Sequence, residues 1–490
     1  MKYSPIIFIL LHNFCYLILK QSKNRAPMNK LFHFATTLVF VSLVGNAYSH
    51  STHFTPPDST TNILDKTAAA YIIEEGKTLY GEGKIKDALI KFRQAGVKDP
   101  NSWRAAYWIS QCHYKLNNFG YSLKYAYKAI GIGKEKVNKE IYYTLAVAQH
   151  RLGKLDSAII NYRLSIEKLS KMRSNILRID HHINECLFAK EEMKNEPKCE
   201  KIRLTGDINS GYDDYNALYT GEKDVLYFTS RRSNTIGGNM NPDDQRYFED
   251  VYRTKWDPIM KEWDDVTNKL GKINSAGFDA LNFIAPDGNS GVVTLNSTAT
   301  DARITTRGSD ICEIKRNSKG DWNHPKAIKN KSINTSFFEG AATLTADGNT
   351  MYFVTDRKGQ KSSTDIYVVH KNGKSWGTAE PLPMTINTKS RETTPFITPD
   401  GRFLFFASDG HLGMGGLDIY VVENKGDSWG EPINLGYGIN SVTNDSHFSY
   451  NKELNQALIS GFEIVGNKAS LDIYEIDLTG FEHGDVRFPY

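Results

Sequence analysis

One sequence module occurs five times in the C-terminal half of this 490-residue chain. Each copy has an Ile-Asn pair, a carboxylate five residues after the Asn, a hydrophobic run, and an Asp followed by Val or Ile and then Tyr or Cys. The pairs are Ile208-Asn209, Ile273-Asn274, Ile333-Asn334, Ile386-Asn387 and Ile439-Asn440, and the triplets begin at Asp250, Asp310, Asp365, Asp418 and Asp472. A period of about 50 to 60 residues with room for four short strands is typical of a β-propeller blade. The module therefore predicts a five-bladed β-propeller over residues 201–478, followed by a C-terminal tail over residues 479–490.

Turn and tryptophan positions place the strands within each module. Hairpin turns are expected at Pro286-Asp287-Gly288, Ala346-Asp347-Gly348 and Pro399-Asp400-Gly401, whereas the fifth module has Asn451-Lys452-Glu453. A Trp precedes the next Ile-Asn pair in four modules, where a wide ring can cover the gap between adjacent blades; these are Trp263, Trp322, Trp376 and Trp429. The segment Lys201–Leu204 is expected to supply the fourth strand of the last blade and so to close the ring.

The preceding segment carries small and aromatic residues at the spacing of a helical repeat. Counted from Ala69, the repeat positions are Gly76, Gly83, Ala88, Phe92, Ala95 and Pro100. This is the tetratricopeptide repeat (TPR) pattern, in which small residues let two antiparallel helices approach and an aromatic ring fills the gap. Further units begin near Trp103 and Lys139. We therefore expect an N-terminal TPR α-solenoid over residues 66–196.

A stack of such units needs a terminal helix to cover its last apolar face. Asn175–Lys194 is expected to form this helix, and Pro197 to end it. We expect Glu185, Lys190, Glu191, Glu192 and Lys194 to face solvent and Ile179, Ile183, Leu187 and Met193 to pack inward. His181, His182 and Cys186 resemble a metal site on the same helix. Because no second ligand pair with metal spacing accompanies them, we interpret them as a solvated face.

The concave surface of TPR proteins is lined by fixed positions of the first helix of each unit. Transferred to this sequence, those positions are Lys77, Tyr80, Arg104, Tyr107, Gln111, Tyr114, Tyr143 and His150. Aromatic rings beside basic groups suit an extended acidic or C-terminal peptide segment. The alternative is that the tyrosines pack on neighbouring helices or on the propeller.

The module carboxylates form a second candidate site on the propeller. They are Asp214, Asp279, Glu339, Glu392 and Asp445, each at the expected start of an innermost strand. Fivefold pseudosymmetry would bring them close to the channel axis, where like charges repel unless a cation compensates. One hypothesis is a site for a cation or for a partner's Lys or Arg. The other is that each carboxylate caps backbone N–H groups or pairs with an Arg of the adjacent blade, such as Arg231 or Arg357.

The first 49 residues have the composition of an export signal. Met28-Asn29-Lys30 precedes the apolar run Leu31–Val44, and Ala47-Tyr48-Ser49 precedes His50, as in a secretory signal peptide. We expect translation to start at Met28, cleavage before His50, and a linker over residues 50–65. An N-terminal membrane anchor is the alternative, although the earlier stretch Pro5–Leu19 is short for a membrane span. No Cys follows the apolar run, so we expect no lipid anchor.

Charge and cysteine content narrow the range of partners. The formal net charge is +4, but Lys2, Lys20, Lys23, Arg25 and Lys30 precede the expected cleavage point, so nothing indicates nucleic acid. The helical half is basic and the propeller half is acidic. Cys112 and Cys312 are expected to be buried as small hydrophobic residues. Cys186 and Cys199 could pair across the domain junction in an oxidising compartment.

Several motifs of the propeller half resemble the TolB-like repeats of Bacteroidetes envelope proteins. They are Pro399-Asp400-Gly401, Ser408-Asp409-Gly410-His411, Gly413-Met414-Gly415-Gly416-Leu417-Asp418-Ile419-Tyr420 and Tyr247-Phe248-Glu249-Asp250-Val251-Tyr252. The resemblance covers residues 69–478. It implies a periplasmic scaffold that is similar to the PorE-like accessory proteins of type IX secretion and gliding. Because the chain stops at Tyr490, we expect no OmpA-like domain, and attachment to peptidoglycan or the outer membrane only through partners.

These observations favour a binding protein. No nucleophile elbow, zinc-protease helix, phosphate loop or dinucleotide fingerprint is present. We therefore predict no enzymatic activity, no catalytic residue, no metal and no cofactor, and a scaffold that binds protein partners through the TPR groove and a propeller face. The alternatives are a carbohydrate-binding or solute-sensing propeller and a five-bladed glycoside-active enzyme that uses channel carboxylates. Similar sequence contexts around all five carboxylates argue against the enzyme, because catalysis needs two groups with unlike pKa values.

Overall fold

The computed structural model describes residues 62–197, 199–222, 224–242, 244–296, 308–357, 363–465, 468–483 and 486–487. The expected signal peptide, the start at Met28 and nearly all of the 50–65 linker lie outside these ranges. The described helices and strands belong to one compact unit that begins at residue 61. None of the described helices is both long and apolar enough to cross a membrane.

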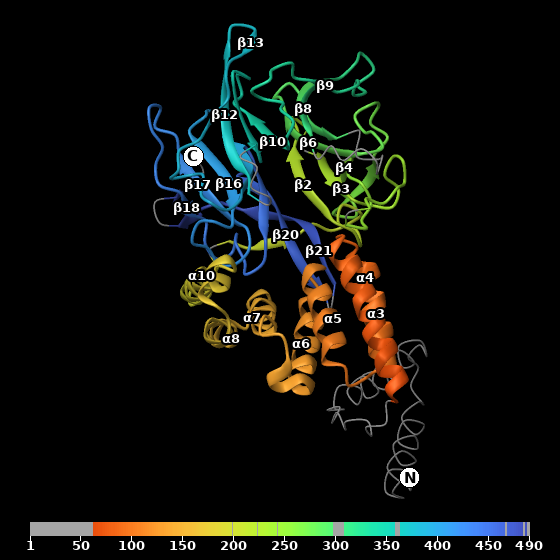
Figure 1. Ribbon diagram of the computed structural model, residues 1–490. Helices are drawn as coiled ribbons and strands as arrows, with labels where there is room; N and C mark the ends of the chain where they lie inside the picture. Colours follow the sequence, from red (N-terminus) through yellow and green to blue (C-terminus); the bar gives the residue numbers. More distant parts are fainter. Residues whose placement is uncertain are drawn as a thin grey trace, which may run out of the picture. The chain divides into compact units, whose positions relative to one another are not determined.

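The helices form antiparallel pairs that stack in chain order (Figure 1). They are α3 (Ile63–Gly81), α4 (Ile85–Lys98), α5 (Trp103–Lys115), α6 (Phe119–Gly133), the short 3-10 helix η1 (Lys134–Lys136), α7 (Ile141–Arg151), α8 (Leu155–Lys168), α9 (Lys171–Ile176) and α10 (Ile179–Glu192). The pairs α3/α4, α5/α6 and α7/α8 are the three predicted TPR units, so the predicted solenoid is confirmed.

Small residues let these helices approach closely. A Cβ atom on Gly76 would lie 2.6 Å from the ring of Phe92, so α3 and α4 can approach only with glycine at this position. Phe92 is fully buried between them and stacks on Trp108 of the next unit. In the second unit serines take the small positions, and the Ser110 hydroxyl donates to the Ser122 carbonyl at 2.8 Å. This hydrogen bond satisfies a polar group that close helix packing removes from water.

The terminal helix differs from its prediction. It is broken into α9 and α10 at Arg178, whose backbone is left-handed with φ 51°. Leu187 and Met193 are exposed rather than packed inward, whereas Glu185 and Cys186 are buried. The spacing of apolar residues predicted the wrong buried face for this helix, because the surface against which α10 packs is partly polar.

Glu185 shows why this face is buried. Its carboxylate lies 3.0 Å from His181 Nε2 and 2.7 Å from His182 Nδ1. Burial would raise the pKa of Glu185, but hydrogen bonds from the two histidines hold it below its usual value. The interpretation of His181 and His182 as a solvated face was therefore wrong. Among the described residues, no group of three His, Cys, Asp or Glu side chains is placed to hold a metal ion.

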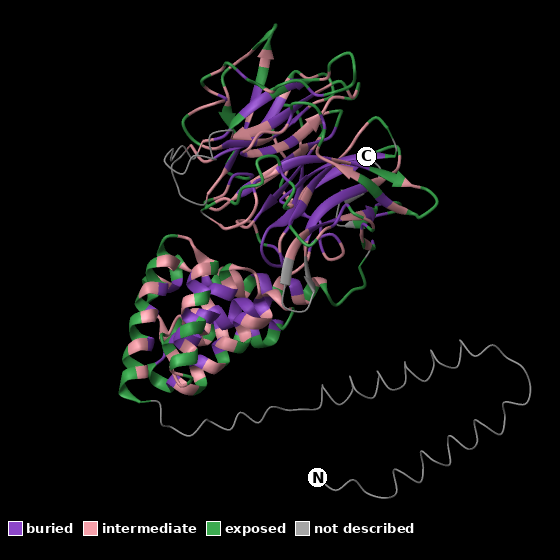
Figure 2. Ribbon diagram, turned by 90° about the vertical axis from the view of Figure 1, so that its right-hand side faces the viewer, coloured by how far each residue is buried: buried purple, intermediate pink, exposed green. Residues whose placement is uncertain are grey.

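The strands form five antiparallel sheets arranged as propeller blades, which confirms the predicted fold. Their bounds, blade by blade, are β2 (Asp214–Tyr219), β3 (Val225–Ser230), β4 (Asp250–Asp257) and β5 (Glu262–Thr267); β6 (Phe278–Ile284), β7 (Ser290–Asn296), β8 (Asp310–Lys315) and β9 (Lys326–Ala327); β10 (Glu339–Leu344), β11 (Thr350–Thr355), β12 (Asp365–Asn372), β13 (Ser375–Trp376) and β14 (Glu380–Pro381); β15 (Glu392–Ile397), β16 (Phe403–Ser408), β17 (Asp418–Glu423) and β18 (Ile433–Asn434); β19 (Asp445–Asn451), β20 (Gln456–Val465) and β21 (Lys468–Asp477). The second and third strands of most blades hold most of the buried strand residues. Figure 2 shows that buried residues are concentrated in the strands of the propeller.

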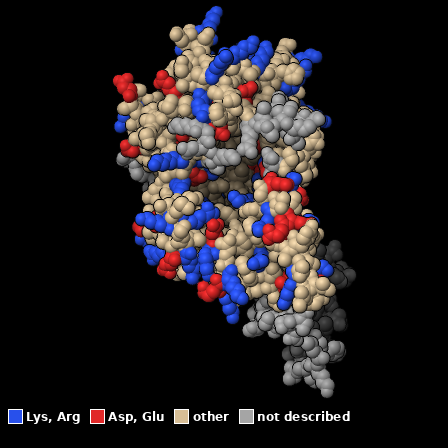
Figure 3. All heavy atoms as spheres, in the orientation of Figure 1, with Lys and Arg blue, Asp and Glu red and all other residues tan. Residues whose placement is uncertain are grey.

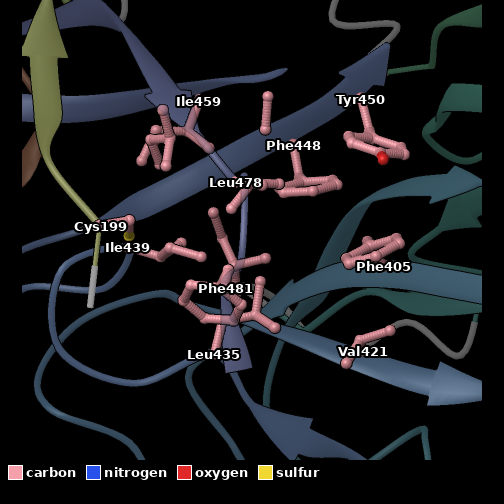
Figure 4. Close-up of a cluster of buried hydrophobic side chains, with 13 residues drawn as sticks. Cys199, Phe405, Val421, Leu435, Ile439, Phe448, Tyr450, Ile459, Leu478 and Phe481 are labelled. Atoms are coloured by element: carbon pink, nitrogen blue, oxygen red, sulfur yellow. The ribbon is translucent and has the colours of Figure 1, made fainter. Parts of the chain in front are cut away.

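The ring closes as the sequence predicts. Strand β1 (Lys201–Arg203) pairs with β21 and becomes the outer strand of the fifth blade. Figure 4 shows the core that joins the fourth and fifth blades, where Phe405 and Phe448 stack with ring centroids 4.1 Å apart. Cys199 belongs to this core, and Phe481, in the segment expected to be a tail, is buried in it. Past Phe481 the chain forms the short pair β22 (Glu482–His483) and β23 (Val486–Arg487).

The Asn of each module has a clear structural role. In every blade the Asn side-chain amide makes two hydrogen bonds of 2.7–2.9 Å with the backbone of the middle triplet residue of the preceding blade. The pairs are Asn209–Ile473, Asn274–Val251, Asn334–Ile311, Asn387–Ile366 and Asn440–Ile419. The amide thus acts as one more residue of strand pairing and fixes where the chain enters the next blade. This contact explains the spacing by which the repeat is recognised.

Candidate functional site

The five module carboxylates lie at the start of the innermost strands and are almost completely buried. Each accepts a backbone N–H and a hydroxyl from the Ser or Thr four residues earlier, at 2.6–3.0 Å. The pairs are Asp214–Ser210, Asp279–Ser275, Glu339–Thr335, Glu392–Thr388 and Asp445–Ser441. Each carboxylate therefore caps the loop that enters its own blade, as the second hypothesis for these residues expects.

Among the described residues, cations accompany three of the five carboxylates. Asp214 pairs with Arg232 at 3.0 Å, Glu339 lies 3.5 Å from Arg357, and Asp445 pairs with Lys201. Arg357 was expected in this role, but it belongs to the same blade as its carboxylate. Arg231 was also expected here, but its guanidinium instead binds Asp244 at 2.6 Å and the Tyr247 carbonyl. The neighbouring Arg232 replaces it because it projects back toward the ring of carboxylates.

Asp279 differs from the other members of the ring. Within the described part of the chain, its Oδ1 atom has no hydrogen-bond partner although the residue is 1% exposed. Burial, with the nearby charges of Asp250 and Glu249, raises the pKa of Asp279 to about 7. Burial also raises the pKa of Glu249, which shares a hydrogen bond with Tyr215. This side of the axis can therefore hold a proton near neutral pH.

The predicted groove residues divide into two groups. Lys77 and Arg104 are exposed, and Tyr80 and Gln111 are partly exposed, on the first two TPR units. Tyr114 of the second unit is also partly exposed, but it packs against the cluster that contains Met414 of the propeller. Tyr107 is buried against Trp108, so it supports the groove rather than lining it. Figure 3 shows Lys and Arg side chains interleaved with Asp and Glu over the helical repeats.

The third TPR unit is occupied by the propeller. His150 is fully buried and contacts the Met414 carbonyl through Nε2 at 2.8 Å, while Arg151 donates to the Val442 carbonyl at 2.8 Å. Met414 itself is completely buried in the cluster formed by α7, α8 and α10, beside Tyr143. For Tyr143 and His150 the alternative of packing on helices and on the propeller is therefore correct.

Sequence analysis missed this inserted loop. A Cβ atom on Gly415 would collide with the Val442 carbonyl and with Arg151, and one on Gly416 would collide with Asn444. The glycines thus let the Met414 backbone reach the helices. The signal was present as the Gly413-Met414-Gly415-Gly416 run, but a family motif gives no indication of which surface it contacts.

Further contacts join the helices to the propeller, among them a hydrogen bond of 3.2 Å from the Tyr437 N–H to Glu192 of α10. Arg178 donates to the Ser390 hydroxyl and, at 2.9 Å, to the Asp409 carbonyl. At the other end of the solenoid, Gln245 of the first blade donates to Asp87 at 2.8 Å and accepts from the backbone of Lys86 at 2.9 Å. Pockets of about 250 and 280 Å³ between these contacts are lined by both domains.

The structure shows whether the cysteines form a disulfide across the junction between the helices and the propeller. All four cysteines of the described ranges are buried and free. Cys186 lies in the helical cluster around Met414, and Cys199 lies in the core between the fourth and fifth blades. The possible disulfide between them is therefore not formed in this structure. Burial raises the pKa of Cys186 to about 12 and that of Cys199 to about 11, so neither is a reactive thiolate at neutral pH.

No family model matches the chain, and no curated protein matches it. The helical segment is similar to the first TPR of Spaghetti bound to an HSP90 peptide (20% identity, 24% of this chain and 98% of that chain, TM-score 0.22). The propeller is similar to an α-L-arabinofuranosidase of Podospora anserina (9% identity, 57% of this chain and 97% of that chain, TM-score 0.36). It is also similar to a thermostable family-43 glycoside hydrolase (12% identity, 58% and 94%, TM-score 0.37).

These matches correct the prediction that the chain is not an enzyme. The solved propellers that align with it include several glycoside hydrolases, so the architecture gives no ground for that prediction. At this level of identity the likeness shows the fold alone and assigns neither a substrate nor a catalytic residue. The argument from blade symmetry was also wrong, because Arg232 accompanies Asp214 whereas no described cation accompanies Asp279.

Proposed function

We propose that this chain is an interaction scaffold that binds an extended segment of a protein partner on its first two TPR units. The observation that carries the proposal is the division of the concave surface. The propeller fills the third unit with Met414, whereas Lys77 and Arg104 stay exposed on the first two units. There the Arg104 guanidinium lies 5.5 Å from the centre of the Trp103 ring, and Tyr80 is partly exposed. Exposed cations beside aromatic rings suit an acidic segment, because both charge and ring faces then find partners.

Site-specific photocrosslinking in the cells that naturally produce this protein tests the proposed function. A photoreactive residue in place of Arg104 should give discrete adducts with a partner. The same residue in place of Val97 should give none, because Val97 lies on α4 and is 79% exposed away from the predicted groove positions. Charge reversal by Lys77→Glu should remove the Arg104 adducts. Equal adducts from both positions, or adducts that persist after charge reversal, would contradict the proposed groove.

We propose in addition that the scaffold acts outside the cytoplasm, in an envelope assembly of the secretion or gliding type. This part is supported by the signal-like segment Met28–Ser49 and by the TolB-like motifs. Mass spectrometry of the mature protein tests the export step. A mature N-terminus at His50 supports it, and retention of the segment before His50 contradicts it.

A second candidate function is carbohydrate binding or turnover on the propeller axis. The observation that favours it is the unlike environment of Asp279, with its raised pKa, beside Glu249 and the paired Asp214. A carboxyl group that holds a proton near neutral pH is the form a general acid needs. Binding and hydrolysis assays with a polysaccharide panel test it, with Asp279→Asn as the variant. Activity that survives this substitution would remove Asp279 from the proposed role.

A further inference from the structure

A pocket of about 690 Å³ lies where the five innermost strands end. Each blade contributes at least one apolar residue to its lining, among them Leu218, Phe283, Leu344, Phe396 and Tyr450. Because all five blades meet there, the pocket lies on the propeller axis. The ring of buried carboxylates and the helical contacts lie at the opposite ends of the same strands, so no described helix lines this mouth.

Acidic side chains surround this mouth. The hairpin between the first and second strands of every blade carries at least one exposed carboxylate; these are Glu222, Asp224, Asp287, Asp347, Asp400 and Glu453. Lys452 and Arg402 stand on the same described hairpins, and Arg402 lies 3.6 Å from Glu423. Negative charge therefore dominates the rim.

Turn hydrogen bonds keep two of these acids ionised. Asp347 accepts from the Thr345 hydroxyl at 2.5 Å and from the Asn349 backbone at 3.0 Å, and these bonds lower its pKa. Asp400 accepts in the same way from Thr398 and from the Arg402 backbone. Partial burial opposes the shift at Asp400, but these bonds leave its pKa below the usual value.

We propose that this mouth binds a basic peptide segment of a partner protein that places apolar side chains in the pocket. Most of the pocket's accessible wall is aliphatic or aromatic, although Asn282, Thr343 and Ser449 also line it, so the centre of the ligand must be largely apolar. The carboxylates stand on separate hairpins around it, so the ligand must carry several positive charges on both sides of that centre. A chain with Lys or Arg flanking apolar residues meets both requirements, whereas a single small cation meets neither.

This site is independent of the TPR groove, since the two surfaces share no residue and attract opposite charges. Loss of one function therefore leaves the other testable. Together they would let the scaffold hold an acidic segment and a basic segment of different partners at the same time.

A binding assay with a synthetic peptide tests the proposal. The probe is a fluorescent peptide with two apolar residues, Leu and Phe, between pairs of lysines, titrated with the full chain at low salt and at about 0.15 M salt. The triple variant Asp287→Asn, Asp347→Asn and Asp400→Asn should weaken binding about tenfold at low salt and less at the higher salt. Asn keeps the side-chain acceptor of each turn, so the fold should be retained.

The matched control is Asp264→Asn, Asp321→Asn and Asp427→Asn, which removes the same charge from exposed positions on the outer strands and hairpins. This variant should bind the probe like the native chain. A peptide with Ser in place of Leu and Phe should bind at least tenfold more weakly, at a level set by charge alone. The proposal is overturned if the native chain does not bind the probe, if both triple variants lose affinity equally, or if the Ser peptide or lysine amide binds as tightly.

Discussion

The two mouths of the propeller use acidic residues in opposite ways. We call the end of the propeller that contacts the helices the covered mouth. There the five module carboxylates are buried and capped by Ser or Thr, and three of them are paired with a described cation. At the open mouth, carboxylates such as Asp347 and Asp400 are exposed on turns around an apolar pocket. Both sets follow the same blade repeat.

Burial decides what each set can do. A buried charge is costly unless it is paired and hydrogen-bonded, so the paired carboxylates of the inner ring are committed to holding the blades together. An exposed carboxylate keeps its hydration and contributes little to stability, so the outer ring is free to recognise a partner. The same residue type thus stabilises the fold at one mouth and is available for binding at the other.

The sharpest way to break this comparison is to remove a paired carboxylate of the covered mouth. Asp214→Ala removes the carboxylate partner of Arg232, which then keeps only neutral acceptors such as the Ile208 carbonyl, and leaves the Ser210 N–H without its acceptor. Breaking a buried ion pair costs about 3–5 kcal/mol, so we expect a loss of that order in the free energy of unfolding. Urea denaturation at neutral pH measures it, with Asp264→Asn on an exposed strand as the control. A loss below about 1 kcal/mol would show that the ring is not structural.

The second test weakens the interface between the helices and the propeller at the covered mouth. Met414→Ala removes a fully buried side chain from the cluster that joins the propeller to α7, α8 and α10. Large-to-small substitutions in a core cost about 2–5 kcal/mol. We expect this loss to appear mainly as faster hydrogen exchange in the third TPR unit and in α10. The control is Met384→Ala, because Met384 is 85% exposed; equal effects of the two variants would contradict a packed interface.

The contact between His150 and Met414 predicts how the stability of the helix–propeller interface depends on pH. Burial, with the nearby charge of Arg151, lowers the pKa of His150 to about 3. Because the folded-state pKa lies below the unfolded value of about 6.5, the stabilisation is complete above pH 6.5 and is lost as the pH falls. One such histidine gives a slope of at most about 1.4 kcal/mol per pH unit.

Comparison with His150→Gln isolates this slope, because other groups titrate in both proteins. The native chain should lose more stability than the variant between about pH 6.5 and pH 4, measured by urea denaturation at each pH. Parallel curves for the two proteins would show that His150 is not held neutral by the interface.

The comparison also shows what the sequence could and could not predict. Periodic residues gave the TPR pairs, the five blades and the closure by Lys201–Leu204, because their contacts recur at a fixed spacing. Contacts that occur once were missed. Met414 and His150 are in contact although they are 264 residues apart in the sequence. The burial of Glu185 depends on elements that pack against α10, which the sequence of α10 alone does not show. Neither contact leaves a repeat in the sequence.

The candidate sites follow the same rule. The ring of carboxylates was found because it repeats, but whether Arg231 or Arg232 serves Asp214 depends on a side-chain direction that alternates between neighbouring residues. In the groove, the repeat positions gave eight candidate residues, of which Tyr107 and His150 are buried. Which of them are open depends on the propeller, and only the structure shows that the third unit is filled.

Asp279 provides the smallest and most discriminating test of the covered mouth. Its Ser275 cap can be kept by an Asn side chain, and no described cation loses a partner when the charge is removed. We therefore expect Asp279→Asn to change the free energy of unfolding by less than about 1 kcal/mol at pH 6, in contrast to Asp214→Ala. Because the raised pKa of about 7 lies above the unfolded value of about 4, the protonated carboxyl stabilises the native chain at low pH.

This stabilisation disappears as the pH rises through 7, so Asp279→Asn should gain stability relative to the native chain between about pH 6 and pH 8. Urea denaturation of both proteins at these two pH values checks the sign. If Asp279→Asn is instead as damaging as Asp214→Ala at both pH values, the carboxylate has an ionic partner, and the ring is uniform rather than divided into paired and unpaired members. That result would also contradict the proposed role of Asp279 as a general acid on the propeller axis.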